Sequence, residues 1–110
     1  MKIPTGHHAI YFYGTLKNSS IVDGYAVKGR LFDLGSFPGI ILGGEKDIPG
    51  QVAIVSDSKL KSLDSYEGVP FLYTRERATA RSIDEPKEAI DVWVYQWAGE
   101  TSQYKEIDKW

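Results

Sequence analysis

Glu67 places a carboxylate where a helical pattern predicts an apolar side chain. Residues 58–66 form the clearest helical segment, and at about 100° per residue Glu67 projects between Leu60 and Leu63. One interpretation is a solvated glutamate at a helix end, where the last turn frays. The other is a carboxylate held at a cavity wall. There, partial burial and the negative end of the helix dipole raise its pKa above the ordinary value of about 4.3, which makes it a better proton acceptor near neutral pH.

The segment YGTL, residues 13–16, is the second candidate for chemistry. It follows the apolar run 9–13, which predicts a buried strand. Gly14 permits a sharp turn, in which consecutive backbone N–H groups can form a concave site that binds a carboxylate without a charged side chain. The alternative is an ordinary turn that ends a strand, with Thr15 bonded to nearby backbone groups. The residues alone leave both interpretations open.

The two adjacent histidines, His7 and His8, do not predict a metal site. Neighbouring residues of a strand point to opposite faces, and no third ligand is evident. The chain also contains no cysteine, which excludes disulfides, thiolate chemistry and cysteine-based metal sites. We therefore predict neither a metal nor a cofactor.

The charge balance argues against a nucleic-acid partner. The 13 basic and 15 acidic residues give a net charge of −2, whereas a protein that neutralises phosphates carries a concentrated basic face. The N-terminus lacks the apolar core of a signal peptide, and no stretch approaches the ~20 apolar residues that span a bilayer. We expect one soluble cytoplasmic domain over residues 1–110, without a membrane partner; the sequence does not indicate its oligomeric state.

Short strands separated by glycine and proline dominate the predicted fold. Alternation is strongest in 89–97, where Ile90, Val92 and Val94 share one face. The predicted strands cover residues 9–13, 25–34, 48–56, 71–82 and 89–97. The tail after residue 98 predicts either a weak terminal helix docked on the domain or a frayed end. The order of elements indicates a mixed α+β domain, chiefly strands curling around one core with one or two helices.

Glycine, proline and capping residues set the predicted boundaries. The second strand is expected to bend at Gly29, and the sequence FPGI at 37–40 predicts a type II turn. The helix is expected to begin at a cap formed by Asp57 or Ser58 and to end at Gly68, which can adopt a left-handed conformation.

Four short motifs occur in an order that resembles the γ-glutamylcyclotransferase-like superfamily, and most closely its small branch of γ-glutamylamine cyclotransferases. The motifs are Tyr13-Gly14-Thr15-Leu16-Lys17, Phe37-Pro38-Gly39, Leu63-Asp64-Ser65-Tyr66-Glu67-Gly68 and Tyr73-Thr74-Arg75. The ordered set of motifs, which spans roughly residues 9–97, is more specific than any one of them. The resemblance implies a small β-barrel-like fold flanked by helices.

The resemblance also implies an enzyme that releases 5-oxoproline from a γ-glutamyl amine or amide. In such a substrate the α-amine attacks its own γ-carbonyl, so the enzyme needs no nucleophile of its own. Glu67 matches the family's catalytic glutamate and would act as general base and then acid. The backbone of residues 13–16 would hold the α-carboxylate or stabilise charge on the γ-oxygen. Which amine leaves is not readable from the sequence.

Tyr73 and Arg75 have the spacing of residues on one face of a strand. Together with Tyr13 they are candidate substrate-binding residues, the two tyrosines as cavity walls and Arg75 as an ion-pair partner for a carboxylate. The alternatives are packing for the tyrosines and a surface salt bridge for Arg75. Asp64 borders the apolar stripe of the helix and is expected to fix a neighbouring loop.

Two interpretations without catalysis remain open. The first is a binding module on the same fold that senses a small carboxylated ligand. The second is a structural domain without a pocket, in which Glu67 forms a salt bridge with Arg75 or Arg77.

Overall fold

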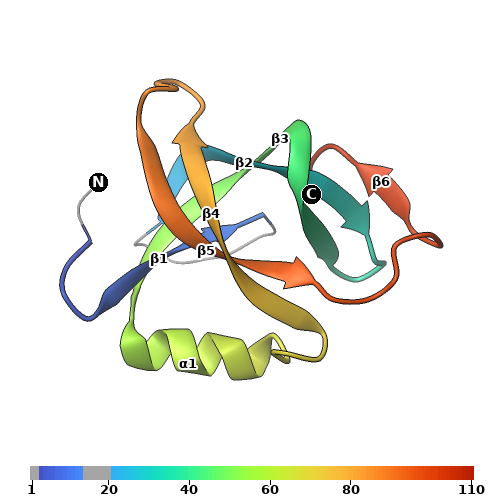
Figure 1. Ribbon diagram of the computed structural model, residues 1–110, viewed down its shortest axis with the longest axis horizontal. Coiled ribbons are helices and arrows are strands. Elements are labelled where there is room, and N and C mark those ends of the chain that lie inside the picture. Colours follow the sequence, from blue (N-terminus) through green and yellow to red (C-terminus); the bar gives the residue numbers. More distant parts are fainter. Residues whose placement is uncertain (1–2, 14–20) are drawn as a thin grey trace.

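The computed structural model describes residues 3–13 and 21–110, and Figure 1 shows their arrangement. The described elements are β1 (His7–Phe12), β2 (Ile21–Asp33), β3 (Pro38–Ser56), α1 (Asp57–Tyr66), β4 (Tyr73–Ser82), β5 (Ala89–Trp97) and β6 (Lys105–Ile107).

Hydrogen bonding closes five of these strands into a barrel. β1 pairs with β3, β3 with β2, β2 with β4, and β4 with β5, all antiparallel. A parallel contact of β1 with β5, at Ile10 and Trp93, joins the two ends of the sheet. β6 adds to β2 with Ile107 opposite Leu31, and α1 packs against β1 and β3 on the outside (Figure 1). The predicted α+β, barrel-like fold is confirmed.

The alternation of β5 divides its side chains between two apolar clusters. Ile90, Val92 and Val94 enter the barrel interior, whereas Tyr95 faces the helix side. The interior cluster also contains Ala9, Tyr11, Tyr25, Val27, Leu31, Ile40, Ile48, Val52 and Ala80. The second cluster consists of Ile10, Val55, Leu60, Tyr73 and Tyr95. Because Leu60 is the one buried residue of α1, this short helix depends on docking rather than on its own propensity.

The bend predicted at Gly29 is confirmed. The register of β2 against β3 shifts between Lys28, which pairs with Asp47, and Gly29, which pairs with Leu42. A Cβ at Gly29 would lie 2.9 Å from the carbonyl oxygen of Ile41. The missing side chain therefore permits a close approach of the two strands at the bulge.

The turn predicted at 37–40 is wrong. Pro38 and Gly39 begin β3, and the chain reverses just before them, where Gly35 has a φ of 108°. Proline is tolerated as the first residue of a strand because its missing N–H is not needed there. A Cβ at Gly39 would lie 2.9 Å from the Cβ of Trp97, so this glycine serves packing rather than a turn.

The helix boundaries were predicted correctly at one end. Gly68 ends α1 with a φ of 69°, but the N-cap is Ser56, whose hydroxyl accepts a hydrogen bond from the N–H of Lys59. Asp57 is instead the first helical residue, and its carboxylate contacts the ring of His8. The predicted caps at Asp57 and Ser58 are therefore wrong, because β3 runs directly into the helix.

The tail is docked, but as a strand. Residues Lys105–Ile107 form β6, and Ile107 packs against the barrel interior. The predicted terminal helix is wrong, because the backbone of this segment bonds to the free edge of β2.

Gly50 supplies a test of the packing beside β1. A Cβ at this position would lie 2.6 Å from two ring atoms of Tyr11, a side chain that is itself buried. We expect Gly50→Ala to lower the free energy of unfolding by about 1–3 kcal/mol, because overpacking forces strand and ring apart. Urea denaturation measures this. Glu76→Ala, on an exposed part of β4, is the control, and an equal loss in both variants would contradict the packing argument.

Candidate functional site

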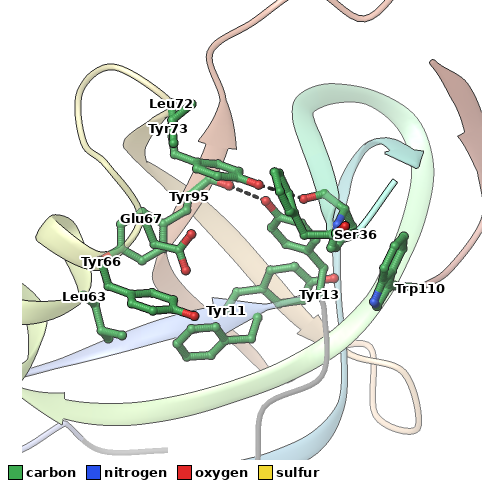
Figure 2. Close-up of a pocket in the computed structure, with 13 residues that line it drawn as sticks. Tyr11, Tyr13, Ser36, Leu63, Tyr66, Glu67, Leu72, Tyr73, Tyr95 and Trp110 are labelled. Carbon is green, nitrogen blue, oxygen red and sulfur yellow. Dashed lines mark hydrogen bonds between the residues drawn. The ribbon is translucent and has the colours of Figure 1, made fainter. Parts of the chain in front are cut away.

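A hollow of about 550 Å³ lies where the C-terminal end of α1 meets the end of β1 and the start of β4 (Figure 2). The loop between β2 and β3 and the last residue of the chain complete its wall. The lining residues are Tyr11, Phe12, Tyr13, Ser36, Phe37, Pro38, Leu63, Tyr66, Glu67, Leu72, Tyr73, Tyr95 and Trp110.

The end of α1 fixes the backbone of Glu67. Glu67 is the C-cap, and its N–H bonds to the carbonyl of Leu63 at 2.8 Å. The N–H groups of Gly68 and Val69 then bond back to Ser65 and Asp64. This double closure with a left-handed glycine is a Schellman motif, which satisfies the last helical carbonyls and stops fraying. Glu67 therefore lies at an ordered helix end, whereas the interpretation of a frayed last turn would have placed it in solvent.

Asp64 ties the same helical turn to the barrel. Its Oδ1 accepts a hydrogen bond from the hydroxyl of Tyr95 at 2.8 Å. Arg75 Nε lies 2.9 Å from the same oxygen as an ion pair, without the alignment of a hydrogen bond. The Arg75 guanidinium also stacks 4.3 Å from the ring centre of Trp93. We call these contacts of Asp64 with Tyr95 and Arg75 the Asp64 anchor. The anchor joins α1 to β4 and β5, three residues before Glu67.

The Glu67 carboxylate points into the hollow (Figure 2). The residue is partly buried, and burial raises the pKa of its carboxyl group above the ordinary value. Within residues 3–13 and 21–110, no side chain is hydrogen-bonded to this carboxylate or forms an ion pair with it. Arg75 pairs with Asp64, and Arg77 stacks on Trp93. The salt bridge that the structural interpretation required is therefore absent from the described part of the chain.

Three tyrosines near the carboxylate, Tyr13, Tyr73 and Tyr95, already donate their hydroxyl protons to other groups. Tyr13 donates to the backbone carbonyl of Tyr95 at 2.6 Å, and Tyr73 donates to that of Pro38 at 2.9 Å. Burial raises the pKa of all three phenols, and the charge of Glu67 adds to the shift. The pKa of Tyr73 reaches about 12. These groups therefore stay neutral near pH 7 and shape the hollow without competing for protons.

The structure brings together three of the predicted site residues. Tyr13, Glu67 and Tyr73 line one hollow. Arg75 does not line it and faces Asp64 instead. The remaining predicted residues, Gly14, Thr15 and Leu16, lie outside the described residues.

Several lining residues were not predicted. The sequence could have identified Tyr95, because strand alternation places its side chain on the face of β5 opposite the interior face. Tyr66 lies beside Glu67 in the quoted motif, but its position on the helix gave no reason to select it. Trp110 had no signal in the sequence, since only the pairing of β6 with β2 brings the tail to this side.

The arrangement suits proton transfer. Within the described residues, no group of three or more potential metal-ligating side chains is present. A carboxylate with a raised pKa, which has solvent on one side and apolar side chains on the other, can accept a proton near neutral pH and return it.

Among the described residues, no helix has the length and apolar character that a membrane span requires.

The raised pKa of Glu67 predicts a pH-dependent stability. Because the folded state binds the proton more tightly than the unfolded state, this group stabilises the fold below the unfolded pKa, and the contribution is lost as pH rises through the folded pKa. We expect Glu67→Gln to gain stability relative to the wild type as pH rises from 4 to 7 in urea denaturation. The same change at exposed Glu76 is the control; an equal gain there would contradict the assignment.

The Asp64 anchor predicts a local effect on the helix end. Tyr95→Phe removes the hydroxyl that bonds Asp64, and we expect the free energy of unfolding to fall by about 1–2 kcal/mol. Hydrogen exchange at the amides of Glu67 and Gly68 should accelerate. The matched control is Tyr25→Phe, which removes a hydroxyl bonded to Glu88. If both variants change exchange at the helix end equally, the anchor does not hold Glu67.

Comparison with known proteins places the chain in a family. The family described as gamma-glutamyl cyclotransferase, AIG2-like, matches residues 10–110. No curated protein has a matching sequence.

Solved structures share the fold at low sequence identity. The chain is similar to an Arabidopsis thaliana protein with a TM-score of 0.74 and 21% identity, over 89% of this chain and 73% of that one. An AIG2-like protein from Mus musculus gives 0.69 and 21%, over 94% and 88% of the two chains. Protein ytfP from Escherichia coli gives 0.64 and 20%, over 92% of each. These likenesses show the fold, and the match over residues 10–110 shows that the chain belongs to the γ-glutamyl cyclotransferase, AIG2-like family.

Proposed function

We propose that the protein releases 5-oxoproline from a γ-glutamyl amine or amide, with Glu67 as the group that moves protons. One observation carries the proposal. The Glu67 carboxylate points into a hollow, its pKa is raised, and no described residue pairs with it. Partial burial of a carboxylate without a partner costs free energy, which is expected where the charge serves a reaction rather than the fold.

The reaction needs no nucleophile from the protein. The α-amine of the glutamyl group attacks the γ-carbonyl carbon of the same molecule, a five-membered lactam forms, and the bond from that carbon to the departing nitrogen breaks. Holding the glutamyl group folded for this attack can lower the activation barrier by roughly 7–11 kcal/mol in favourable intramolecular systems. The wall of the hollow, with Tyr13 and Tyr73, is the surface against which we propose that the glutamyl group folds.

Proton balance requires a base that also acts as an acid. The α-amine is an ammonium near pH 7 and cannot attack until it loses a proton. Two protons leave this nitrogen as the lactam N–H forms, and two are taken up by the departing nitrogen, which leaves as an ammonium. Glu67 can carry protons in this one direction and return to its initial state.

The remaining predicted site residues enter the proposal in two ways. Tyr13 lines the hollow, which supports the segment 13–16 as the element that binds the α-carboxylate or the γ-oxygen. We propose that Arg75 acts through Asp64, which it pairs with at 2.9 Å. Arg75 is then a positioning residue that keeps the end of α1, and so Glu67, at the hollow.

Glu67→Gln tests the proposal. The variant keeps the size of the side chain and removes the base, so we expect 5-oxoproline release to fall by about 10²–10⁴-fold. The wild-type rate should rise with pH through the pKa of Glu67, and this limb of the pH profile should disappear in the variant. Incubation with γ-glutamyl compounds and quantification of 5-oxoproline measures both.

Glu76→Gln is the control, because it makes the same chemical change on an exposed part of β4. Full turnover in Glu67→Gln would overturn the mechanism. Thermal stabilisation by γ-glutamyl compounds without any product, in the wild type and in Glu67→Gln alike, would favour the binding module.

A further inference from the structure

We propose that the amine half of the substrate is apolar and uncharged, and that Tyr66, Leu72 and Trp110 form the surface that receives it. This inference rests on the proposed function and concerns the part of the substrate that departs. We call these three residues the amine wall.

The amine wall consists of large apolar side chains left open to solvent. Tyr66 is 84% exposed, Leu72 52% and Trp110 44%, and all three line the hollow. They come from the end of α1, the residue before β4 and the end of the chain. Figure 2 shows them on different sides of the Glu67 carboxylate. Large exposed apolar side chains that border one pocket from several sides, rather than lying singly elsewhere on the surface, indicate a binding site.

The size of the hollow leaves room for this second half. Its volume of about 550 Å³ falls within the roughly 300–1,000 Å³ of pockets that take drug-sized ligands. A glutamyl group is much smaller than such a ligand. The folded glutamyl group next to Glu67 therefore leaves space beside the amine wall, where a substituent on the departing nitrogen would lie.

The charge of the wall disfavours a carboxylate on the departing amine. Among the described residues that line the hollow, Glu67 has the only charged side chain. A second carboxylate, as in a γ-glutamyl amino acid, would lose solvation against Tyr66, Leu72 and Trp110 and would face the charge of Glu67. Repulsion of this kind would raise the pKa of Glu67 further, so that a smaller fraction of this carboxylate would be ionised and able to take a proton at a given pH.

A second ammonium is disfavoured for a different reason. It would be attracted to Glu67, which must be free to take the proton of the α-ammonium. A cation bound there would hold the only side-chain carboxylate of the described lining in an ion pair. An apolar substituent gains from burial against the wall and leaves the base free.

Four amides of one glutamyl group test the inference on the full-length protein. They are γ-glutamyl-phenethylamine, γ-glutamyl-phenylalanine, which adds only a carboxylate, γ-glutamyl-methylamine, which lacks the apolar group, and the γ-glutamyl amide of a short diamine. We expect kcat/KM for 5-oxoproline release from the phenethylamide to exceed that for each of the others by about tenfold or more. Equal or faster turnover of the phenylalanine, methylamine or diamine compound would overturn the inference.

Variants of the wall separate recognition from folding. Leu72→Asn and Trp110→Ser should each lower kcat/KM for the phenethylamide several-fold more than for the methylamide. Phe71→Asn is the matched control, because Phe71 is 88% exposed, adjacent to Leu72 and not part of the lining; it should leave the ratio unchanged. Trp110 lies at the chain end, so its variant keeps the test open if Leu72→Asn fails to fold. An unchanged ratio in Trp110→Ser and in a folded Leu72→Asn would overturn the role of the wall.

The outcomes separate this inference from the proposed function. If none of the four amides yields 5-oxoproline, both the proposed function and the inference that rests on it fail. If all four yield it without preference for the apolar amine, the function stands and the inference is overturned.

Discussion

The attachment of one helical turn to two strands is the constraint on which the site depends. Asp64 accepts the Tyr95 hydroxyl and pairs with Arg75, and three residues later the helix ends in a Schellman motif. With one buried residue, α1 has little other hold on the barrel. The backbone hydrogen bonds and the contacts of Asp64 together fix the backbone at this end of the helix beside the hollow. The Asp64 anchor therefore positions Glu67 as part of the lining of the hollow rather than on the open surface.

Three neighbouring tyrosines leave the Glu67 carboxylate available because their own hydroxyl groups are already hydrogen-bonded. Three tyrosines of the lining direct their protons elsewhere, Tyr13 to the backbone of β5, Tyr73 to Pro38 and Tyr95 to Asp64. Had one of these hydroxyls donated to Glu67, the ionised form would have been stabilised and the pKa lowered. Burial instead raises the pKa. Neutral, saturated neighbours are thus what leave the carboxylate available to a ligand.

Sequence patterns predicted the parts of this design that depend on local chemistry. The strand alternation of 89–97, the bend at Gly29 and the glycine that ends the helix follow from side-chain period and backbone freedom. What failed depended on contacts between distant segments. Pro38 and Gly39 look like a turn until Trp97 occupies the space beside Gly39. Asp57 looks like a cap until His8 engages its carboxylate. Glu67 was found because its place on an apolar face conflicted with its charge, whereas Trp110 broke no local rule.

The position of Trp110 shows how the barrel recruits a tail that carries no motif. β6 pairs with β2, and Ile107 packs on the interior cluster. Glu106 pairs with Arg30 at 2.8 Å, and Asp108 contacts Lys46. Exposed ion pairs of this kind contribute little to stability, so the apolar contact and the strand pairing provide most of the attachment of the tail. The tail places Trp110 at a hollow whose other walls come from β1, the β2–β3 loop, α1, β4 and β5. Closure of the barrel, rather than any single motif, is what gathers both ends of the sequence around Glu67.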